Sequence, residues 1–300
     1  MHSPKPLGAL LSLLLAVPAG AAGGRRIFIA VDMEGIGGVV TDAQLGPEGF
    51  EYSRFRELMT EEANTAIAAA RLEGAAEFVV ADSHGNFQNL LVDRLPPDVE
   101  VVRGGPRPLG MMQGIDGSFD GAIFIGYHAS TTNPAGVRAH TFSSANLADV
   151  KLNDRSVTEG AWCAALAAHF GVPVLAVSGD EAAVKEVQAL VAGVAGAVVK
   201  WPYGFHSART LSPEASRKAI AEAVRKGMAR RGQPPSFHVE TPVKVEVRFK
   251  NYRPAEVASW LPGVERVDAH AIRYTARDMV EAALVPGVLP GGSAPLNRRS

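Results

Sequence analysis

Four short runs of this sequence are apolar apart from Glu77 at the start of one of them, and they constrain the fold more than any other feature. Such runs are typical of parallel strands that helices cover on both faces, whereas a strand with one face in water alternates apolar and polar residues. Helical patterns over 53–73 and 158–170 separate the runs, and a glycine follows each pattern where a helix should end. The sequence therefore predicts a layered α/β/α domain with a mainly parallel sheet. The four runs are residues 27–31, 77–81, 121–126 and 173–177.

The alternation of apolar runs with helical patterns stops at about residue 200. A serine followed by proline at 212–213 predicts the start of a helix that reaches about residue 231. Residues 243–249 then alternate strictly, which is typical of a half-buried antiparallel strand. We also expect a strand over 264–274 and a short helix over 276–284. These elements predict a smaller C-terminal α+β part beside the parallel sheet.

The first residues have the pattern of a cleaved secretory signal peptide. An apolar stretch, Leu7 to Val17, precedes Pro18 and the small residues Ala19-Gly20-Ala21. The stretch is shorter than the roughly 20 residues that span a bilayer. We therefore expect an exported chain, periplasmic or secreted, with no membrane contact after cleavage. The expected division is a signal peptide over 1–22, a metal-binding catalytic α/β domain over 23–200, an α+β domain over 201–285 and a disordered tail over 286–300.

Composition excludes some classes of function. The formal net charge of −1 gives no electrostatic footprint for nucleic acid or an anionic membrane. Cys163 is the only cysteine, so the chain has no internal disulfide. We expect Cys163 to be a small buried residue within a helix.

Polar side chains gather where the predicted parallel strands end. In open α/β sheets, ligands bind beyond the carboxyl ends of the strands. The first run ends in Asp32 and Glu34, and side chains two apart on an extended strand point to the same side. The second run leads to His84 and the third to His128. The fourth leads to Asp180, and we expect either Ser178 or Asp180 to cap a following helix.

Two neighbouring carboxylates in a dry site repel each other unless one takes up a proton or a cation lies between them. Imidazoles beside them favour zinc or a similar transition metal. If one carboxylate bridges, the set is large enough for two ions. The alternatives are a cap or ion pairs for Asp32 and Glu34, a turn for His84 and a satisfied polar group for His128. Clustering at one edge of the sheet favours the metal.

Several blocks of the sequence, in order, resemble the zinc-dependent D-aminopeptidase family of the dipeptide-transport operon type. They are "VDMEGIGG", "MTEEAN", "DSHGNFQNL", "GYHAS" with "PAGVRAHT", "LNDRSVTEG" and "LSPEAS". The later stretch "VKVEVRFKNYRPAE" with "LPGVER" and "TARDM" is similar to the C-terminal part of that family. The resemblance covers nearly the whole chain after the predicted signal.

The resemblance implies two zinc ions per chain, with Asp32 bridging them. Matching positions imply that Glu34, His84, His128 and Glu159 complete the metal ligands, and that His140 is the catalytic histidine, as nucleophile or base. The implied activity is hydrolysis of the N-terminal peptide bond of short D-amino-acid peptides, D-Ala-D-Ala among them. The implied assembly is a ring-like homo-oligomer.

Three functions stay open at this point. The first is metal-assisted hydrolysis of a peptide bond, in which His140 moves a proton or attacks directly. Asp82 would then either orient a ligand imidazole or only form a turn. The second is another two-metal hydrolase, such as a phosphoesterase, and the third is an exported binding protein for peptides or metal without catalysis.

Overall fold

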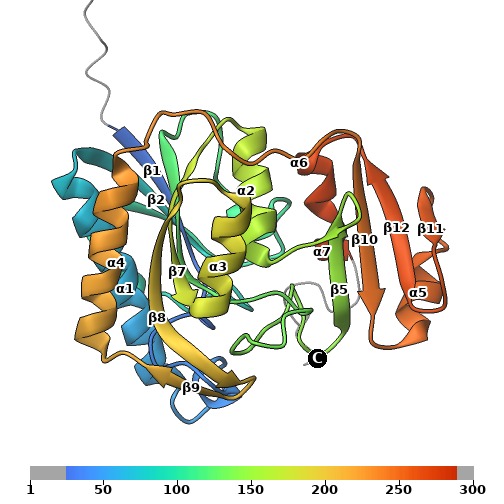
Figure 1. The fold of residues 1–300 in the computed structure, drawn as a ribbon, viewed down its shortest axis with the longest axis horizontal. Coiled ribbons are helices and arrows are strands. Elements are labelled where there is room, and N and C mark those ends of the chain that lie inside the picture. Colours follow the sequence, from blue (N-terminus) through green and yellow to red (C-terminus); the bar gives the residue numbers. More distant parts are fainter. Residues whose placement is uncertain (1–24, 289–300) are drawn as a thin grey trace, which may run out of the picture.

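The computed structural model describes residues 25–288 of the 300-residue chain. The larger sheet has seven strands in the order β3-β2-β1-β4-β7-β8-β9, and all neighbours are parallel except β8 and β9 (Figure 1). The four apolar runs form its centre, as the sequence predicts. The strands are β1 (Arg25–Val31), β2 (Ala75–Asp82), β3 (Val99–Val102), β4 (Gly121–Tyr127), β7 (Val174–Asp180), β8 (Ala195–Gly204) and β9 (Ser207–Thr210).

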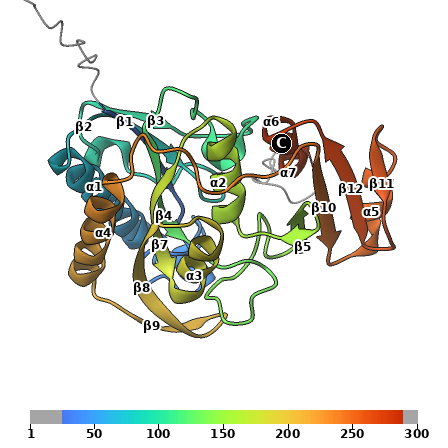
Figure 2. The same ribbon diagram turned by 45° about the horizontal axis from the view of Figure 1, so that its top comes forward.

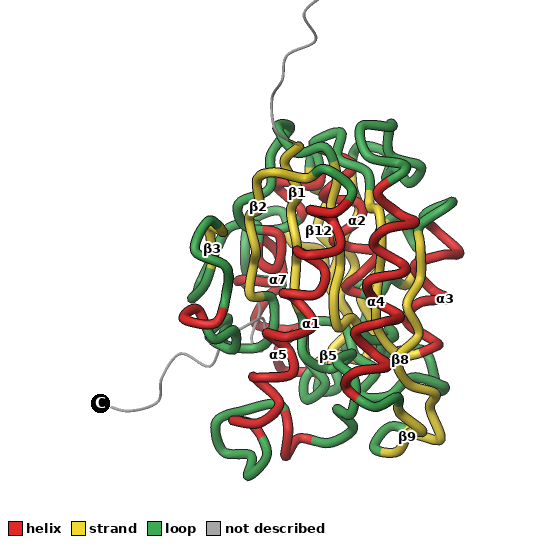
Figure 3. Tube along the Cα trace, turned by 90° about the vertical axis from the view of Figure 1, so that its left-hand side faces the viewer, coloured by secondary structure: helices red, strands yellow, loops and turns green. Residues whose placement is uncertain are grey.

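Helices cover both faces of this sheet, so the predicted layered α/β/α arrangement is confirmed. Helices α1 (Tyr52–Leu72) and α4 (Pro213–Met228) lie side by side on one face, while α2 (Glu159–His169) and α3 (Glu181–Leu190) lie on the other (Figures 1 and 3). Successive residues of β1 alternate between two cores. Ile27, Ile29 and Val31 pack on the side of α1 and α4, whereas Phe28 and Ala30 pack on the side of α2. Each fully buried side chain of this size stabilises the fold by roughly 1.5–3 kcal/mol.

A second, antiparallel sheet of five strands lies beside the first, in the order β11-β12-β10-β5-β6 (Figure 2). Strand β10 (Val243–Phe249) pairs with β12 (Ala271–Ala276) and β5 (Leu147–Leu152). Its alternating residues Val243, Val245, Val247 and Phe249 are buried, as the pattern predicts. The remaining elements around it are β6 (Arg155–Ser156), β11 (Val264–Arg266) and α5 (Tyr252–Ala258).

The chain crosses between the two sheets more often than its patterns indicate. Strands β5 and β6 precede residue 200 but belong to the second sheet, whereas β9 and α4 follow it and belong to the first. The predicted domain boundary at residue 200 therefore does not coincide with the division between the sheets. The physical reason is apolar contact: Ile220 and Val224 of α4 are buried in the core that α1 shares with β1.

Two C-terminal predictions need correction. The single strand expected over 264–274 is two strands, because Asp268 accepts a hydrogen bond from the amide of His270 (2.7 Å) and turns the chain. Residues 286–288, expected to belong to a disordered tail, are helical instead: α6 (Met279–Ala282) is followed by α7 (Leu284–Val288), which the buried Val285 fixes against the core around α2. The predicted signal peptide and the rest of the tail lie outside the described residues.

The described part of the chain also has three short 3-10 helices, at Asp42–Gln44, Val92–Arg94 and Gly110–Met112. Among residues 25–288, no helix has both the length and the apolar character needed to cross a lipid bilayer.

Candidate metal centre

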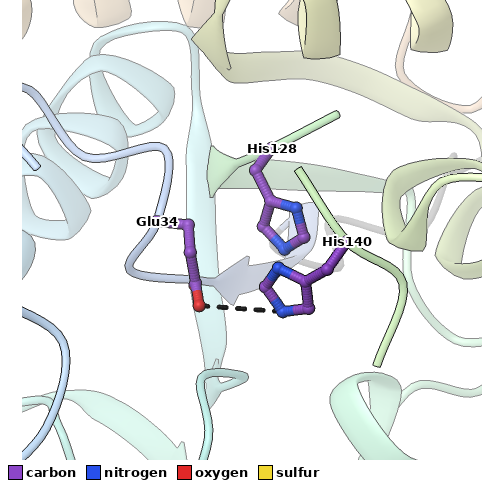
Figure 4. A group of neighbouring side chains, drawn as sticks. All are labelled: Glu34, His128 and His140. Atoms are coloured by element: carbon purple, nitrogen blue, oxygen red, sulfur yellow. Dashed lines mark ion pairs between the residues drawn. The ribbon is translucent and has the colours of Figure 1, made fainter. Parts of the chain in front are cut away.

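Six buried polar side chains meet at the carboxyl edge of the parallel sheet. They are the six residues singled out from the sequence: Asp32, Glu34, His84, His128, His140 and Glu159. Figure 4 shows three of them: the carboxylate of Glu34 faces the imidazole of His140, whose ring lies beside that of His128. The structure brings the whole predicted set together, and the role of each member stays a prediction.

The end of β1 is held tightly across the end of β4. The amide of Asp32 donates to the Ile125 carbonyl (2.8 Å), and the amide of Gly35 donates to the Gly126 carbonyl (2.7 Å). Gly126 has φ +75°, and a Cβ there would lie 2.2 Å from the Asp32 carbonyl oxygen. Only glycine therefore permits this approach, which places the two β1 carboxylates beside the residue that follows β4.

The other side chains come from separate elements. His84 follows β2 and His128 follows β4. Glu159 is the first residue of α2, whose N-cap Thr158 accepts a hydrogen bond from the amide of Ala161 (2.8 Å). His140 lies on the loop after β4, where its amide donates to the Ala129 carbonyl (3.0 Å).

All three imidazoles are oriented by backbone carbonyls. A carbonyl oxygen can only accept a hydrogen bond, so the ring nitrogen that contacts it carries the proton. The three bonds run from Nε2 of His84 to the Leu45 carbonyl (2.7 Å), from Nδ1 of His128 to the Ala129 carbonyl (3.1 Å) and from Nδ1 of His140 to the Arg138 carbonyl (2.7 Å). The second nitrogen of each ring therefore faces the carboxylates. Metal-binding histidines usually have this arrangement, in which the outer N–H is held by a carbonyl or carboxylate.

Asp32 lies between two of these imidazoles. Its Oδ1 is 3.4 Å from Nδ1 of His84, and its Oδ2 is 3.3 Å from Nε2 of His128. The same His84 nitrogen is 2.8 Å from Oε2 of Glu34, and the same His128 nitrogen is 3.3 Å from Oε2 of Glu159. The contacts thus form two groups that share Asp32: one with Glu34 and His84, the other with His128 and Glu159.

The set fits a metal. Oδ2 of Asp32 and Nε2 of His128 are buried and have no hydrogen-bond partner within the described chain, which is costly unless something else satisfies them. Nitrogen and carboxylate oxygen ligands suit zinc and similar divalent ions.

The pKa shifts of the cluster also indicate that it fits a metal ion. Burial, together with the nearby Glu34, raises the pKa of Asp32 to about 6. Burial would also raise the pKa of Glu34, but His84 outweighs it and holds that pKa well below its usual value. Burial opposes the charged form of His84 and His128, yet Glu34 and Glu159 raise their pKa values well above the ordinary value. The carboxylates thus require positive charge beside them, which a metal supplies when it displaces these protons.

His140 has a different environment. Its Nε2 lies 3.8 Å from Oε1 of Glu34 and 3.7 Å from Oε1 of Glu159, longer than a hydrogen bond. Burial and the neighbouring His128 lower the pKa of His140. The side chain therefore offers an unprotonated Nε2 to the site. This nitrogen can accept a proton, and its position near Glu34 and His128 also permits metal binding.

Lys200 supports the site in a way that sequence reasoning missed. Its side chain is fully buried, and Nζ donates to the carbonyl oxygens of Glu34, Ile36 (3.1 Å) and Val39 (2.6 Å). Burial lowers the pKa of Lys200 to about 8. The sequence does contain an indication of this role, because a charged residue, Lys200, directly follows the apolar stretch "AGAVV".

A cavity opens directly beside the metal centre. Its wall includes Asp32, Glu34, His84, His140 and Glu159, and also Arg107, Phe142, Trp162 and residues 286–287 of α7. Arg107 lies in the proline- and glycine-rich stretch "RGGPRP", and nothing in its pattern indicated a place in the site. Cys163 is buried in the wall, as expected, and burial raises the pKa of its thiol.

Asp82 does not orient an imidazole. Its carboxylate accepts hydrogen bonds from the amide and the side-chain amide of Asn89 (2.5 and 2.9 Å) and from the amide of Leu90 (2.7 Å). It therefore shapes the turn that carries His84, which was the simpler of its two interpretations. Of the two expected caps of α3, the structure has Asp180, whose carboxylate accepts hydrogen bonds from the amides of Ala182 and Ala183 (2.9 and 3.0 Å).

The parallel sheet and the imidazole–carboxylate cluster at its carboxyl edge together define an α/β metalloenzyme. Residues 25–285 match the family model described as D-aminopeptidase. The chain is 35% identical over 259 residues to the D-aminopeptidase of Bacillus subtilis (strain 168), an alignment that covers 86% of this chain and 93% of the relative. The chain belongs to the D-aminopeptidase family and is a hydrolase of peptide bonds.

The fold is also similar to a solved structure, that of the Zn-dependent D-aminopeptidase DppA from Bacillus subtilis, described as a self-compartmentalizing protease. The TM-score is 0.82 and the sequence identity is 34%, with 86% of this chain and 94% of that chain covered. The resemblance found in the sequence blocks is thereby confirmed at the level of the family.

Proposed function

We propose that this protein is a zinc-dependent D-aminopeptidase that releases the N-terminal residue from short D-amino-acid peptides such as D-Ala-D-Ala. The observation that carries the proposal is the buried cluster in which three carbonyl-oriented imidazoles face three carboxylates. Family membership supports the reaction, and the description of DppA as Zn-dependent supports the metal.

Two zinc ions would be held, with Asp32 as the shared ligand. Glu34 and His84 would complete one group, and His128 and Glu159 the other. When bound, zinc acts as a Lewis acid that polarises the scissile carbonyl and lowers the pKa of water.

His140 would move the proton. Its Nδ1–H is already donated to the Arg138 carbonyl, so Nε2 is the nitrogen that can accept a proton from water. Hydrolysis adds the hydroxyl group to the carbonyl carbon, and His140 would return the proton to the amine that leaves. The lowered pKa of His140 keeps its neutral form available at neutral pH. A direct attack by Nε2 on the carbonyl carbon is the alternative role.

We also propose a ring-like homo-oligomer. The description of DppA as self-compartmentalizing supports it. Large apolar side chains are exposed around α5 of the second sheet: Tyr252 at 58%, Trp260 at 73% and Leu261 at 49%. Such side chains are common at subunit contacts. The molar mass of the purified protein in light scattering tests the proposal, and a monomer would contradict it.

Export is a further proposal, and it rests on the sequence of residues 1–22 alone. The mass of the protein recovered from the producing cell tests it. A mature N-terminus near residue 22 outside the cytoplasm would agree, and an intact Met1 inside it would contradict.

The activity itself is tested by rates on three substrates with zinc-loaded protein. The proposal predicts rapid hydrolysis of D-Ala-D-Ala, slow hydrolysis of L-Ala-L-Ala and no turnover of a phosphoester. Turnover of the phosphoester alone would favour the other two-metal hydrolase. Binding of D-Ala-D-Ala without any hydrolysis would favour the exported binding protein.

A further inference from the structure

The cavity beside the metal centre is strongly asymmetric in charge. Three carboxylates, of Asp32, Glu34 and Glu159, lie in one part of its wall. Arg107 is the only lysine or arginine among the described residues that line it. We propose that Arg107 binds the free α-carboxylate of the peptide substrate, so that the enzyme recognises unblocked C-termini. This inference rests on the aminopeptidase function proposed above.

The guanidinium of Arg107 is held in place by neutral groups. Nη2 donates to the Asp82 carbonyl (2.8 Å) and Nη1 to the Val102 carbonyl (3.3 Å). The guanidinium carbon lies 3.8 Å from the centroid of the Phe87 ring, a cation–π contact that fixes its plane. No ion pair joins Arg107 to a carboxylate within residues 25–288. Its positive charge therefore lies in the cavity wall with no carboxylate of the described chain in direct contact. Burial lowers the pKa of the guanidinium to about 10, although the nearby charge of Asp82 favours its protonated form.

Arg107 also keeps unused donors. An arginine has five N–H groups, of which these two carbonyls take two, while Nε is buried and has no partner in the described chain. One N–H on each terminal nitrogen remains for a ligand. A guanidinium can donate two parallel N–H groups to the two oxygens of one carboxylate. Such bidentate, charge-assisted hydrogen bonds are stronger than those to neutral acceptors. A ligand carboxylate would also offset the cost of a partly buried, unpaired charge.

The hydrogen bond to the Asp82 carbonyl places Arg107 close to the metal ligands. Asp82, whose carbonyl binds Nη2, pairs with Val31 in the parallel register, and Asp32 is the next residue of that neighbouring strand. His84 follows Asp82 by two positions. Adjacent strands are about 4.8 Å apart, and two extended residues span roughly 7 Å. A short peptide can therefore reach from the metal ligands to Arg107.

A free dipeptide fits this arrangement. Its scissile peptide bond would lie at the metal centre, and its negative C-terminal carboxylate would lie toward Arg107. A peptide whose C-terminus is an amide lacks this charge and leaves the guanidinium unpaired. Loss of one charged hydrogen-bonding partner lowers affinity by roughly 10- to 100-fold.

The test measures the initial rate of peptide-bond cleavage by the zinc-loaded enzyme in D-Ala-D-Ala and in the same dipeptide with a C-terminal amide. The variants are Arg107→Gln, which removes the charge, and Arg107→Lys, which keeps it. Arg103→Gln is the matched control, because Arg103 lies on the same segment but is exposed and outside the cavity wall.

The wild type should favour the free acid by roughly 10- to 100-fold in kcat/KM, chiefly through KM. Arg107→Gln should lose this factor on the acid and keep its rate on the amide, so that the preference disappears. Arg107→Lys should restore part of the preference, and Arg103→Gln should behave as wild type.

Two results would overturn the proposal. One is equal use of acid and amide by the wild type. The other is an equal loss on both substrates in Arg107→Gln, which would mean that Arg107 only supports the loop. If the wild type hydrolyses neither substrate, the proposed function fails instead. Calorimetric titration with D-Ala-D-Ala then decides the carboxylate site: weaker binding in Arg107→Gln supports it, and unchanged or absent binding refutes it.

Discussion

The imidazole rings of His128 and His140 are stacked, with their centroids 4.1 Å apart and their planes 11° apart. Their surroundings nevertheless shift their pKa values in opposite directions. Burial opposes the charged form of His128, but Glu159 and Asp32 raise its pKa, whereas burial and His128 itself lower the pKa of His140. Two neighbouring groups with opposed pKa shifts are typical of different roles in one site. We therefore expect His128 to hold metal and His140 to exchange protons.

Replacement of His140 should separate catalysis from metal binding. His140→Ala should lower kcat for D-Ala-D-Ala by roughly 10²- to 10⁴-fold, because a general acid–base group contributes about that much. Zinc content should stay at the wild-type value, since the five proposed ligands remain. The exposed His238→Ala serves as the control and should leave both quantities unchanged. Loss of zinc in His140→Ala would make His140 a metal ligand instead.

Lys200 should contribute to zinc affinity through the chain segment that it holds. Lys200→Met removes the donor shared by the carbonyls of Glu34, Ile36 and Val39, so the position of the Glu34 carboxylate becomes less defined. Loss of such support typically lowers metal affinity by roughly 10- to 100-fold. Competition with a chromophoric chelator measures it, with the exposed Lys218→Met of α4 as control. Unchanged zinc affinity with a lower melting temperature would reduce Lys200 to a purely structural role.

Glu62 should make the stability of the protein depend on pH. Burial raises the pKa of this α1 carboxyl from 4.5 to about 7, although the amide of Gly37 donates to it. The folded state therefore binds the proton more tightly than the unfolded state does. The resulting stabilisation is fully present below pH 4.5 and is lost as the pH rises through 7. Its size is about 3 kcal/mol, at 1.36 kcal/mol for each pKa unit.

The measurement compares the free energy of unfolding of wild type and Glu62→Gln at several pH values. Glutamine mimics the protonated carboxyl, so the wild type should lose about 3 kcal/mol relative to the variant between pH 4.5 and pH 8. The exposed Glu222→Gln should show no such change. A difference that is constant with pH would mean that Glu62 titrates normally.

Much of the parallel sheet could be predicted because its signal is local. An uninterrupted apolar run such as 27–31 is buried on both faces, and the ligand-binding edge of such a sheet follows from its topology. The positions of Asp32, Glu34, His84 and His128 at this edge are therefore predictable from the strand ends alone. Glu159 begins a helix instead and resembles any first-turn acid, so only the family resemblance identified it.

The remaining features depend on contacts between distant segments. Strand β5 carries no sign that it pairs with β10, which begins about 90 residues later along the chain. Arg107 enters the cavity because the backbone carbonyls at the ends of β2 and β3 and the Phe87 ring hold it, and none of these contacts has a sequence signature. Residues 286–288 look like the start of a disordered tail, yet burial of Val285 fixes them in α7.

The zinc content of purified wild type and Asp32→Ala, measured together with hydrolysis of D-Ala-D-Ala and L-Ala-L-Ala, tests the central claim most directly. The account predicts about two zinc ions per chain and D-selective hydrolysis in the wild type, because Asp32 is the carboxylate that both groups of ligands share. Both zinc and activity should be lost in Asp32→Ala. A wild type without metal that still hydrolyses D-Ala-D-Ala, or a variant that keeps both ions, would contradict it.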